Sequence, residues 1–542
     1  MTDSVMLELS CLESTKPENK LKVGETVEHE PAQANSGEPT SFLNDESTTI
    51  HSVDKIIEQS LGGFGWVQLV QAFLVALSSL FDSLQTFISI FTDADPKWHC
   101  TNSNSSICNP NSNICNIPKS SWAWNGHSSE TTVSAWGLEC SSSFMTGLPA
   151  SSYFMGSLLG GFVLAVFADS SIGRKKLLFL SCLAMSFTSA ITVFSTNIWV
   201  YSALRFVCGI CRVPIGTCNL VLLTEKVGKE WRGRVGVMEE LFFTLGYLSL
   251  PGIAYLTKGS SWKSLYLATS IPTFCYCLVL LFFVSESPRW LLTQGRHEEA
   301  IVVLKTISSS TKSNPALLSQ LSKLDKPLEG ETSKPNHWSM IKKLFKKKWA
   351  LQRMVGLLVP GFCIGLGYFG MALGVGNLDM NLYLSVTLNA LLEIPSCVMT
   401  FLMIEKWSRK GSLITLCVLG GIFGIMTPFA RIGGIVIGLE LAAFFCACTA
   451  YNVIMIYTVE LFPTCVRNFV TTAVRQTLMF GAVFGPVIVS SWRNNELLSY
   501  RVFGALLLVS GFFMVRLPET RGVALSDTID EQEQKDNNTM PV

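Results

Sequence analysis

Apolar runs long enough to cross the ~30 Å hydrocarbon core of a bilayer alternate with polar segments along most of the chain. The first six runs lie at about 67–91, 145–167, 177–196, 199–223, 235–257 and 264–284. The second six lie at about 352–373, 380–404, 412–430, 433–458, 468–490 and 501–516. This pattern predicts an all-α polytopic membrane protein whose twelve transmembrane helices form two pseudo-symmetric six-helix halves.

The polar segments divide the chain into five predicted parts. Residues 1–65 are rich in Glu, Ser, Thr and Lys, a composition that predicts a disordered tail, and they lack the pattern of a signal peptide. The other parts are the N-terminal half, the central loop, the C-terminal half and the C-terminal tail: 66–284 (with a long loop at 92–144), 285–350, 351–516 and 517–542.

The overall composition agrees with a protein that lies in a lipid bilayer. Hydrophobic residues make up 49% of the 542 residues and charged residues only 15%, against roughly a quarter in soluble domains. The formal net charge of +1 gives no electrostatic basis for binding nucleic acid. We therefore expect lipid as a partner and no nucleic acid.

Basic residues in the short loops predict the orientation in the membrane. The loop between the second and third runs contains Arg174, Lys175 and Lys176, and the matching loops 4–5 and 8–9 are also basic, whereas loops 3–4 and 7–8 have no Lys or Arg. Basic loops stay in the cytosol. We expect both termini and the central loop to be cytosolic, in either the plasma membrane or the vacuolar membrane.

The long loop 92–144 on the opposite side contains four cysteines. Cys100, Cys108, Cys115 and Cys140 have seven, six and twenty-four residues between them, which does not match the spacing of zinc ligands. An even number of cysteines in an oxidising compartment predicts two disulfides, with three pairings possible; four free thiols are the alternative. Asn104 begins a glycosylation sequon in the same loop.

Acids and bases recur at matching places in the two halves. Glu225 stands seven residues before Arg232, and Glu460 stands seven residues before Arg467. Paired halves with matching loops are typical of transporters that bind their substrate at the centre. We predict a cytosolic gate whose charges pair across the halves in one state and separate in the other, although basic loops also set topology. The predicted gate residues are Asp169, Arg174, Glu225, Arg232, Glu405, Arg409, Glu460 and Arg467.

A few charged or polar residues fall inside apolar runs, where they are costly. An arginine at the centre of a membrane helix costs about 2.5–3.5 kcal/mol, so it faces a partner, a cavity or a substrate path. Arg212 and Arg475 are the two most deeply placed arginines, and Asp82 and Gln85 lie in the first run. All four are candidate binding residues, with Asp82 also a candidate proton site.

Several short motifs carry a resemblance to a known family. They are Trp98-His99-Cys100, Trp136-Gly137-Leu138-Glu139-Cys140, Thr224-Glu225-Lys226-Val227-Gly228, Glu286-Ser287-Pro288-Arg289-Trp290, Asn381-Leu382-Tyr383-Leu384, Glu393-Ile394-Pro395 and Glu460-Leu461-Phe462-Pro463-Thr464. Together they resemble the major facilitator superfamily and, within it, the plant members of the organic cation/carnitine transporter group. One departure is Met479, which aligns with an aspartate of the animal cation-type members.

The resemblance implies secondary-active transport of small organic cations or zwitterions by alternating access. Tyr368, Asn381, Tyr383 and Glu393 match positions of the family's central cavity, where aromatic faces stabilise a cation by up to about 2 kcal/mol. The plainer alternatives are core aromatics and a structural polar pair. We hypothesise that Arg475 or Arg212 binds the carboxylate of a zwitterion such as carnitine while tyrosines hold its ammonium group.

Other functions have less support in the sequence. A proton-coupled sugar transporter of the same superfamily is the nearest alternative, but the seventh run, GFCIGLGYFGMALG, lacks the paired glutamines expected of sugar porters. A transport-inactive sensor is a further alternative. No phosphate-binding loop, HExxH or GxSxG motif is present, so we expect neither an enzyme nor a cofactor or metal. Coupling to a proton is left open.

Overall fold

The computed structural model describes residues 65–101, 108, 114–167, 172–307, 337–377, 381–430, 432–491, 497–522, 526 and 528–539 of the 542-residue chain. The predicted disordered tail lies outside the described residues except for its last position, and so do Asn104 and Asp169. The side chain of Glu405 lies outside them as well.

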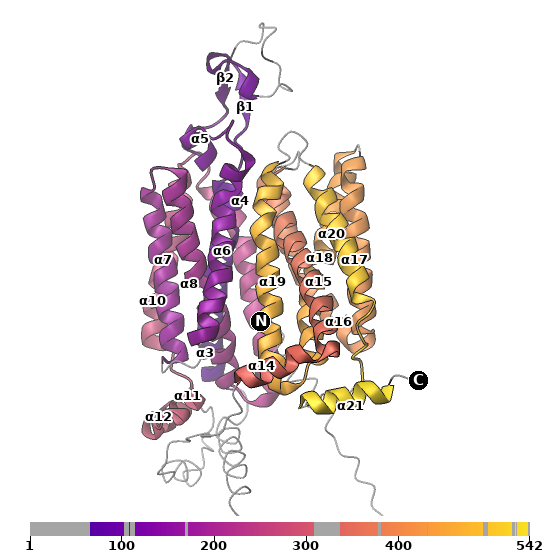
Figure 1. Cartoon of the computed structure of the whole chain (residues 1–542). Coiled ribbons are helices and arrows are strands. Elements are labelled where there is room, and N and C mark those ends of the chain that lie inside the picture. Colours follow the sequence, from indigo (N-terminus) through magenta and orange to yellow (C-terminus); the bar gives the residue numbers. More distant parts are fainter. Residues whose placement is uncertain are drawn as a thin grey trace, which may run out of the picture.

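Twelve of the described helices have 17 residues or more, and they stand side by side as a bundle (Figure 1). The first six are α3 (Trp66–Phe87), α6 (Ser143–Phe167), α7 (Arg174–Ile191), α8 (Ile198–Glu225), α9 (Arg232–Leu256) and α10 (Trp262–Phe283). The second six are α15 (Lys348–Gly374), α16 (Leu382–Lys406), α17 (Arg409–Met426), α18 (Gly433–Leu461), α19 (Thr464–Ser491) and α20 (Leu498–Met514). Each coincides with one predicted run.

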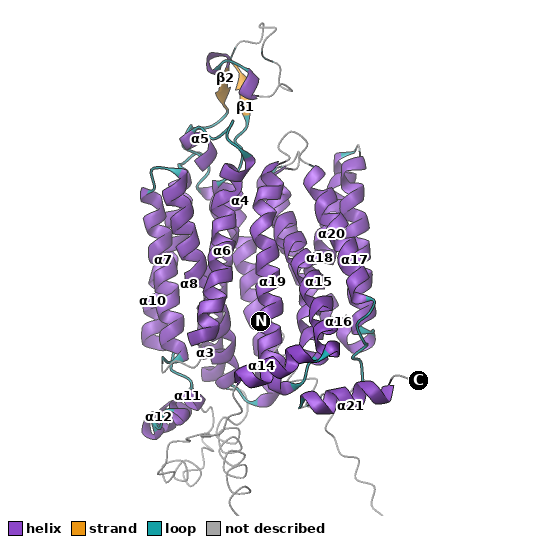
Figure 2. Ribbon diagram, viewed as in Figure 1, coloured by secondary structure: helices purple, strands orange, loops and turns teal. Residues whose placement is uncertain are grey.

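Shorter elements lie at the two ends of the bundle (Figure 2). One end, called the disulfide side below, has α4 (Ser89–Thr92), α5 (Thr132–Trp136) and an antiparallel ribbon of β1 (Trp98–Cys100) and β2 (Trp122–Trp124). The other end, called the basic side, has α11 (Pro288–Thr293), α12 (His297–Ile307), α14 (His337–Lys346) and α21 (Ile529–Thr539). The pattern of apolar runs gave no indication of this two-stranded ribbon.

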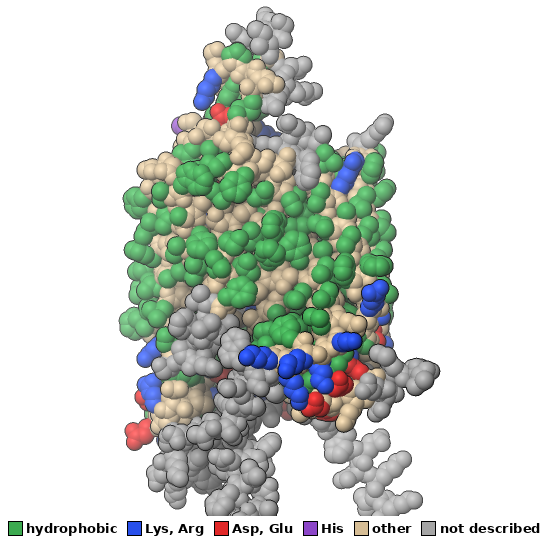
Figure 3. Space-filling view, in the orientation of Figure 1, with side chains coloured by type: hydrophobic (Ala, Val, Ile, Leu, Met, Phe, Trp, Pro, Cys, Tyr) green, Lys and Arg blue, Asp and Glu red, His purple; other side chains and the backbone are tan. Residues whose placement is uncertain are grey.

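The outer surface of the bundle is suited to lipid. Hydrophobic side chains cover the middle of the face seen in Figure 3, whereas Lys and Arg gather along its lower edge near α14 and α21. Nine of the described helices are long and apolar enough to cross a membrane. The helix α9 is not among them, because it has four charged residues in its first nine positions, and these lower its hydropathy.

Two glycines mark places where helices meet backbone to backbone. Gly156 in α6 faces the carbonyl of Phe206 in α8, with no room for a methyl group, which holds these two helices of the first half together. Gly147, near the start of α6, faces the backbone of Pro486 and Val487 in α19. This second contact joins the two halves at the disulfide side.

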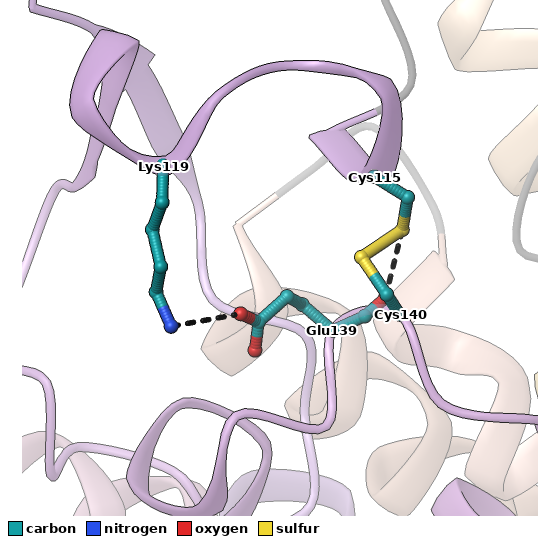
Figure 4. Close-up of a disulfide and its surroundings, with 4 residues drawn as sticks. All are labelled: Cys115, Lys119, Glu139 and Cys140. Carbon is teal, nitrogen blue, oxygen red and sulfur yellow. Dashed lines mark hydrogen bonds and ion pairs between the residues drawn. A yellow bond between two sulfur atoms is a disulfide. The ribbon is translucent and has the colours of Figure 1, made fainter.

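The loop on the disulfide side is covalently closed and docked onto the bundle. Disulfides join Cys100 to Cys108 and Cys115 to Cys140, which selects one of the three possible pairings. Beside the second disulfide, Lys119 Nζ lies 3.7 Å from the carboxylate of Glu139 (Figure 4).

An aromatic cluster anchors this loop. The ring of Trp136 in α5 packs edge-on against Tyr201 in α8 and Trp262 in α10, with centroids 5.5 Å apart in both pairs. Asp93 accepts hydrogen bonds of 2.9 Å from the hydroxyls of both Thr132 and Tyr201. The loop is therefore fixed to the helices by packing and by a carboxylate.

Candidate functional site

A cavity of about 700 Å³ lies between the two halves. Residues from α3, α6, α7, α8 and α9 line it on one side, and residues from α15, α16, α18 and α19 on the other. Its lining reaches Arg174 at the start of α7 and Asn468 near the start of α19, both on the basic side. The cavity therefore extends from the middle of the bundle toward the basic side.

Aromatic side chains join the halves on the disulfide side. Tyr383 in α16 stacks on Phe91 and meets Tyr255 of α9 edge-on, both with centroids 5.5 Å apart. Asn381 lies just before α16 and accepts a hydrogen bond of 3.0 Å from the backbone N–H of Tyr383. Neither Asn381 nor Tyr383, which the sequence placed at the site, is among the described residues that line the cavity.

Asp82 and Arg212, two predicted site residues, form one ion pair in the cavity wall. The Arg212 Nε and Nη2 donate hydrogen bonds of 2.8 and 2.6 Å to the two oxygens of Asp82. The Arg212 side chain is only 13% exposed and the Asp82 side chain only 6%. Bidentate geometry and low exposure make this a strong pair, so the charge of Arg212 is already compensated by the protein.

Tyr368 and Glu393, two further predicted residues, lie together on the opposite wall. The Tyr368 hydroxyl donates a hydrogen bond of 2.5 Å to one oxygen of Glu393, and Thr244 in α9 donates one of 3.0 Å to the other. Because Thr244 belongs to the first half and Glu393 to the second, this contact also connects the halves. The ring of Tyr368 stacks on Phe444 at 5.6 Å.

Gln85 is buried among helices of the first half. Its side chain donates a hydrogen bond of 3.1 Å to Thr269 and accepts one of 2.8 Å from Ser189. Its backbone carbonyl accepts a hydrogen bond of 3.1 Å from the buried Arg205. Gln85 is not among the described residues that line the cavity. In this conformation its hydrogen bonds connect α3 to the neighbouring helices of the first half.

The predicted residue Arg475 lines the cavity from α19, close to Met479 and Gln476. The described part of the chain offers it no hydrogen bond or ion pair, in contrast to Arg212. A half-buried guanidinium in such a position is available for an anionic group of a ligand.

Two acids that the sequence reasoning missed also line the cavity. Glu239 and Glu240 are adjacent in α9. The signal was present, because acids inside a membrane helix are rare and mark sites. Their position close to the basic loop that precedes α9 makes them resemble charges of the loop and not of the membrane helix.

The predicted gate residues that the structure describes lie at the basic side, and the contacts of Glu460 and of Glu225 given next lie within their own halves. Arg409 Nε lies 3.2 Å from Glu460, which also accepts a hydrogen bond of 2.6 Å from Thr520. In the first half, Ser287 donates a hydrogen bond to Glu225, and the positive charges of Arg174 and Arg289 attract its carboxylate. The two halves thus repeat one arrangement.

Two further acids cap the helices that follow the basic loops. Glu286 accepts a hydrogen bond of 2.8 Å from the backbone N–H of Lys175, and Glu519 accepts one of 2.9 Å from that of Arg409. An acid at a helix N-terminus accepts hydrogen bonds from the free N–H groups, and its negative charge is stabilised by the positive end of the helix dipole. Arg232 and Arg467 have contacts of their own at this side. Pairing of the gate across the halves stays a prediction for another conformation.

Comparisons with known proteins agree with this architecture. The family model described as sugar (and other) transporter matches residues 100–531. The inward open conformation of the xylose transporter XylE from E. coli aligns with a TM-score of 0.58 at 17% identity, over 86% of this chain and 98% of that one. At this identity the likeness concerns the fold alone, and it confirms the predicted twelve-helix architecture.

Sequence relatives are closer. The chain is 49% identical over 516 residues to organic cation/carnitine transporter 2 of Arabidopsis thaliana, covering 92% of this chain and 97% of that protein. It is 32% identical over 489 residues to organic cation/carnitine transporter 4 of the same plant, covering 88% and 90%. With solute carrier family 22 member 3 of Mus musculus it shares 30% identity over 420 residues, covering 74% and 72%. The resemblance drawn from the motifs is confirmed.

Proposed function

The chain belongs to the sugar (and other) transporter family of multi-pass membrane proteins, and we propose that it carries small organic cations or zwitterions of the carnitine type by alternating access. The family consists of transporters and not of enzymes. Its relatives in Arabidopsis thaliana include organic cation/carnitine transporters 2, 3 and 5, and these names support this substrate class.

The observation that supports the proposal most is the placement of charge in the cavity. Arg475 faces it without a protein partner among the described residues, while the ring of Tyr368 and several acidic side chains line the same space. A zwitterion has a carboxylate for the arginine and an ammonium group for the aromatic and acidic side of the cavity. Arg212, the other arginine considered from the sequence, is held by Asp82, so we assign the carboxylate of the ligand to Arg475.

The proposal includes an orientation. The basic side, which carries Lys343 and Lys347 beside α21, faces the cytosol, because basic loops are retained there. The cavity, which extends to that side, is then open to the cytosol in this conformation, and the disulfides face an oxidising compartment. The plasma membrane and the vacuolar membrane both meet these conditions.

Transport by the purified protein tests the assignment. The wild type, reconstituted in liposomes, is given labelled carnitine, labelled choline and labelled glucose, each with and without a pH gradient. We expect uptake of carnitine and choline but not of glucose, and an effect of the gradient on the cations would show coupling to protons. Uptake of glucose alone would favour the sugar carrier and overturn the proposal.

The Arg475→Gln variant tests the assignment of the carboxylate. Carnitine has a carboxylate and choline has none, so the variant should lose carnitine uptake, by about tenfold or more, while choline uptake is kept. Arg516→Gln is a matched control, since Arg516 is exposed at the basic end of the last long helix. Equal loss for both substrates would contradict this role of Arg475.

A further inference from the structure

Two acids of the cavity lie outside the pairs described above, and Glu239 is the more informative of them. Glu239 lines the cavity from α9 and is only 5% exposed. Its Oε2 atom is buried and has no hydrogen-bond partner among the described residues. A buried carboxylate oxygen without a partner is unfavourable, because it has lost its water and gained nothing in exchange.

The other acids of the cavity differ from Glu239 in this respect. Both oxygens of Asp82 accept hydrogen bonds from Arg212. Both oxygens of Glu393 accept hydrogen bonds, from Tyr368 and from Thr244. Glu240 has a contact of its own. Glu239 is therefore the acid with a buried oxygen left for a ligand.

The charges around Glu239 fit a ligand with a positive group. Glu240 adds negative charge next to Glu239, while Asp82 is already paired with Arg212, and the positive charge of Arg475 lies within electrostatic range on the opposite half. No hydrogen bond or ion pair between Glu239 and Arg475 is found among the described residues. An acid and an arginine thus face one cavity from the two halves without a direct ion pair between them among the described residues.

We propose, resting on the transport function above, that Glu239 binds the cationic head group of the transported molecule. In a zwitterion the ammonium group lies against Glu239 and the carboxylate against Arg475, so one ligand contacts both halves. A cation without a carboxylate binds Glu239 and makes no contact with Arg475. Glu393, whose oxygens are already occupied, then stabilises the cavity wall through Tyr368.

Kinetics of choline and carnitine uptake in liposomes test this role. Glu239→Gln keeps the size of the side chain but removes its charge, so we expect KM to rise about tenfold or more for both substrates, with a smaller change in the maximal rate. Glu239→Asp keeps the charge and should retain part of the affinity. Glu230→Gln is the control, because Glu230 is an exposed acid in the turn just before α9 and should leave KM unchanged.

A binding measurement separates recognition from the transport cycle. Choline should raise the melting temperature of the purified wild type and of Glu230→Gln, but not that of Glu239→Gln. An unchanged KM with a reduced maximal rate, or an undiminished thermal shift, would show that Glu239 acts in the conformational change, and would overturn the inference. Wild-type protein that transports neither choline nor carnitine would instead overturn the proposed function itself.

Discussion

The hydroxyl of Tyr368 donates a hydrogen bond of 2.5 Å to Glu393, so a tyrosine of α15 and an acid of α16 share one buried polar centre. Phenylalanine at position 368 would keep the stacking on Phe444 and leave one oxygen of Glu393 without its donor. Hydrogen bonds to charged groups contribute about 1.5–3 kcal/mol.

We therefore expect Tyr368→Phe to lower cation uptake by about tenfold, measured as initial rates in liposomes. Tyr500→Phe is a close control, because the Tyr500 hydroxyl is buried in the last long helix and finds no hydrogen-bond partner in the part of the chain that the structure describes. Equal effects of the two substitutions would mean that the loss comes from general packing and not from the contact with Glu393.

Breaking the pair of Asp82 and Arg212 should destabilise the protein. Asp82→Asn leaves a buried guanidinium without its counter-charge, which typically costs about 3–5 kcal/mol. The double variant Asp82→Asn, Arg212→Gln removes both charges and should recover much of that loss. Thermal unfolding of the purified protein measures this, and additive losses in the double variant would show that the two residues are not coupled.

The C-terminal helix α21 is held by ion pairs of different exposure. Arg353 Nη2 lies 2.7 Å from Asp536 with side chains 9% and 18% exposed, whereas Lys343 Nζ lies 2.8 Å from Asp530 with side chains 48% and 60% exposed. Exposed pairs contribute little because solvent screens them. We expect Asp536→Asn to lower thermal stability measurably and Asp530→Asn to have no effect. The opposite order would contradict the burial argument.

Asp93, which lies beyond the end of α4, should make stability depend on pH. Burial raises the pKa of Asp93 to about 6, above its ordinary value of 3.8. Between these values the folded protein keeps a proton that the unfolded chain has released, so this contribution is complete at low pH and is lost as pH rises through about 6.

Asp93→Asn imitates the protonated form at every pH. Its melting temperature should therefore lack the decrease that the wild type shows as pH is raised from about 4 to about 7, whereas Glu230→Gln should keep that decrease. A decrease of the same size in Asp93→Asn would mean that other groups cause it.

The sequence predicted the helices well because each membrane helix must satisfy its own backbone and present apolar side chains to lipid. It could not show that Asp82 and Arg212 bind each other, because 130 residues separate them. Nor could it tell Tyr368, which lines the cavity, from Tyr383, which lies in the aromatic contacts between the halves. Both are aromatic residues in apolar runs, and only the packing of helices distinguishes them.

The predicted gate shows the same limit. The sequence placed Glu460 and Arg409 among the predicted gate residues, and they meet at one end of the bundle. The matching intervals between acids and bases carried no information on whether charges pair within a half or across the halves, because that depends on the conformation. The division of the chain into its five predicted parts stays a prediction as well.

The contact of Gly147 with Pro486 and Val487 is suited to be the point about which the two halves rotate. It lies near one end of α6 and of α19, while the cavity separates the halves toward the other end. About 30 Å of helix lies between Gly147 and the far end of α6 at 1.5 Å per residue. If the halves rotated about this contact by roughly 10°, the far end of α6 would move by about 5 Å. A larger side chain at position 147 would push the two helices apart at this contact and so change how far the other end of the cavity opens.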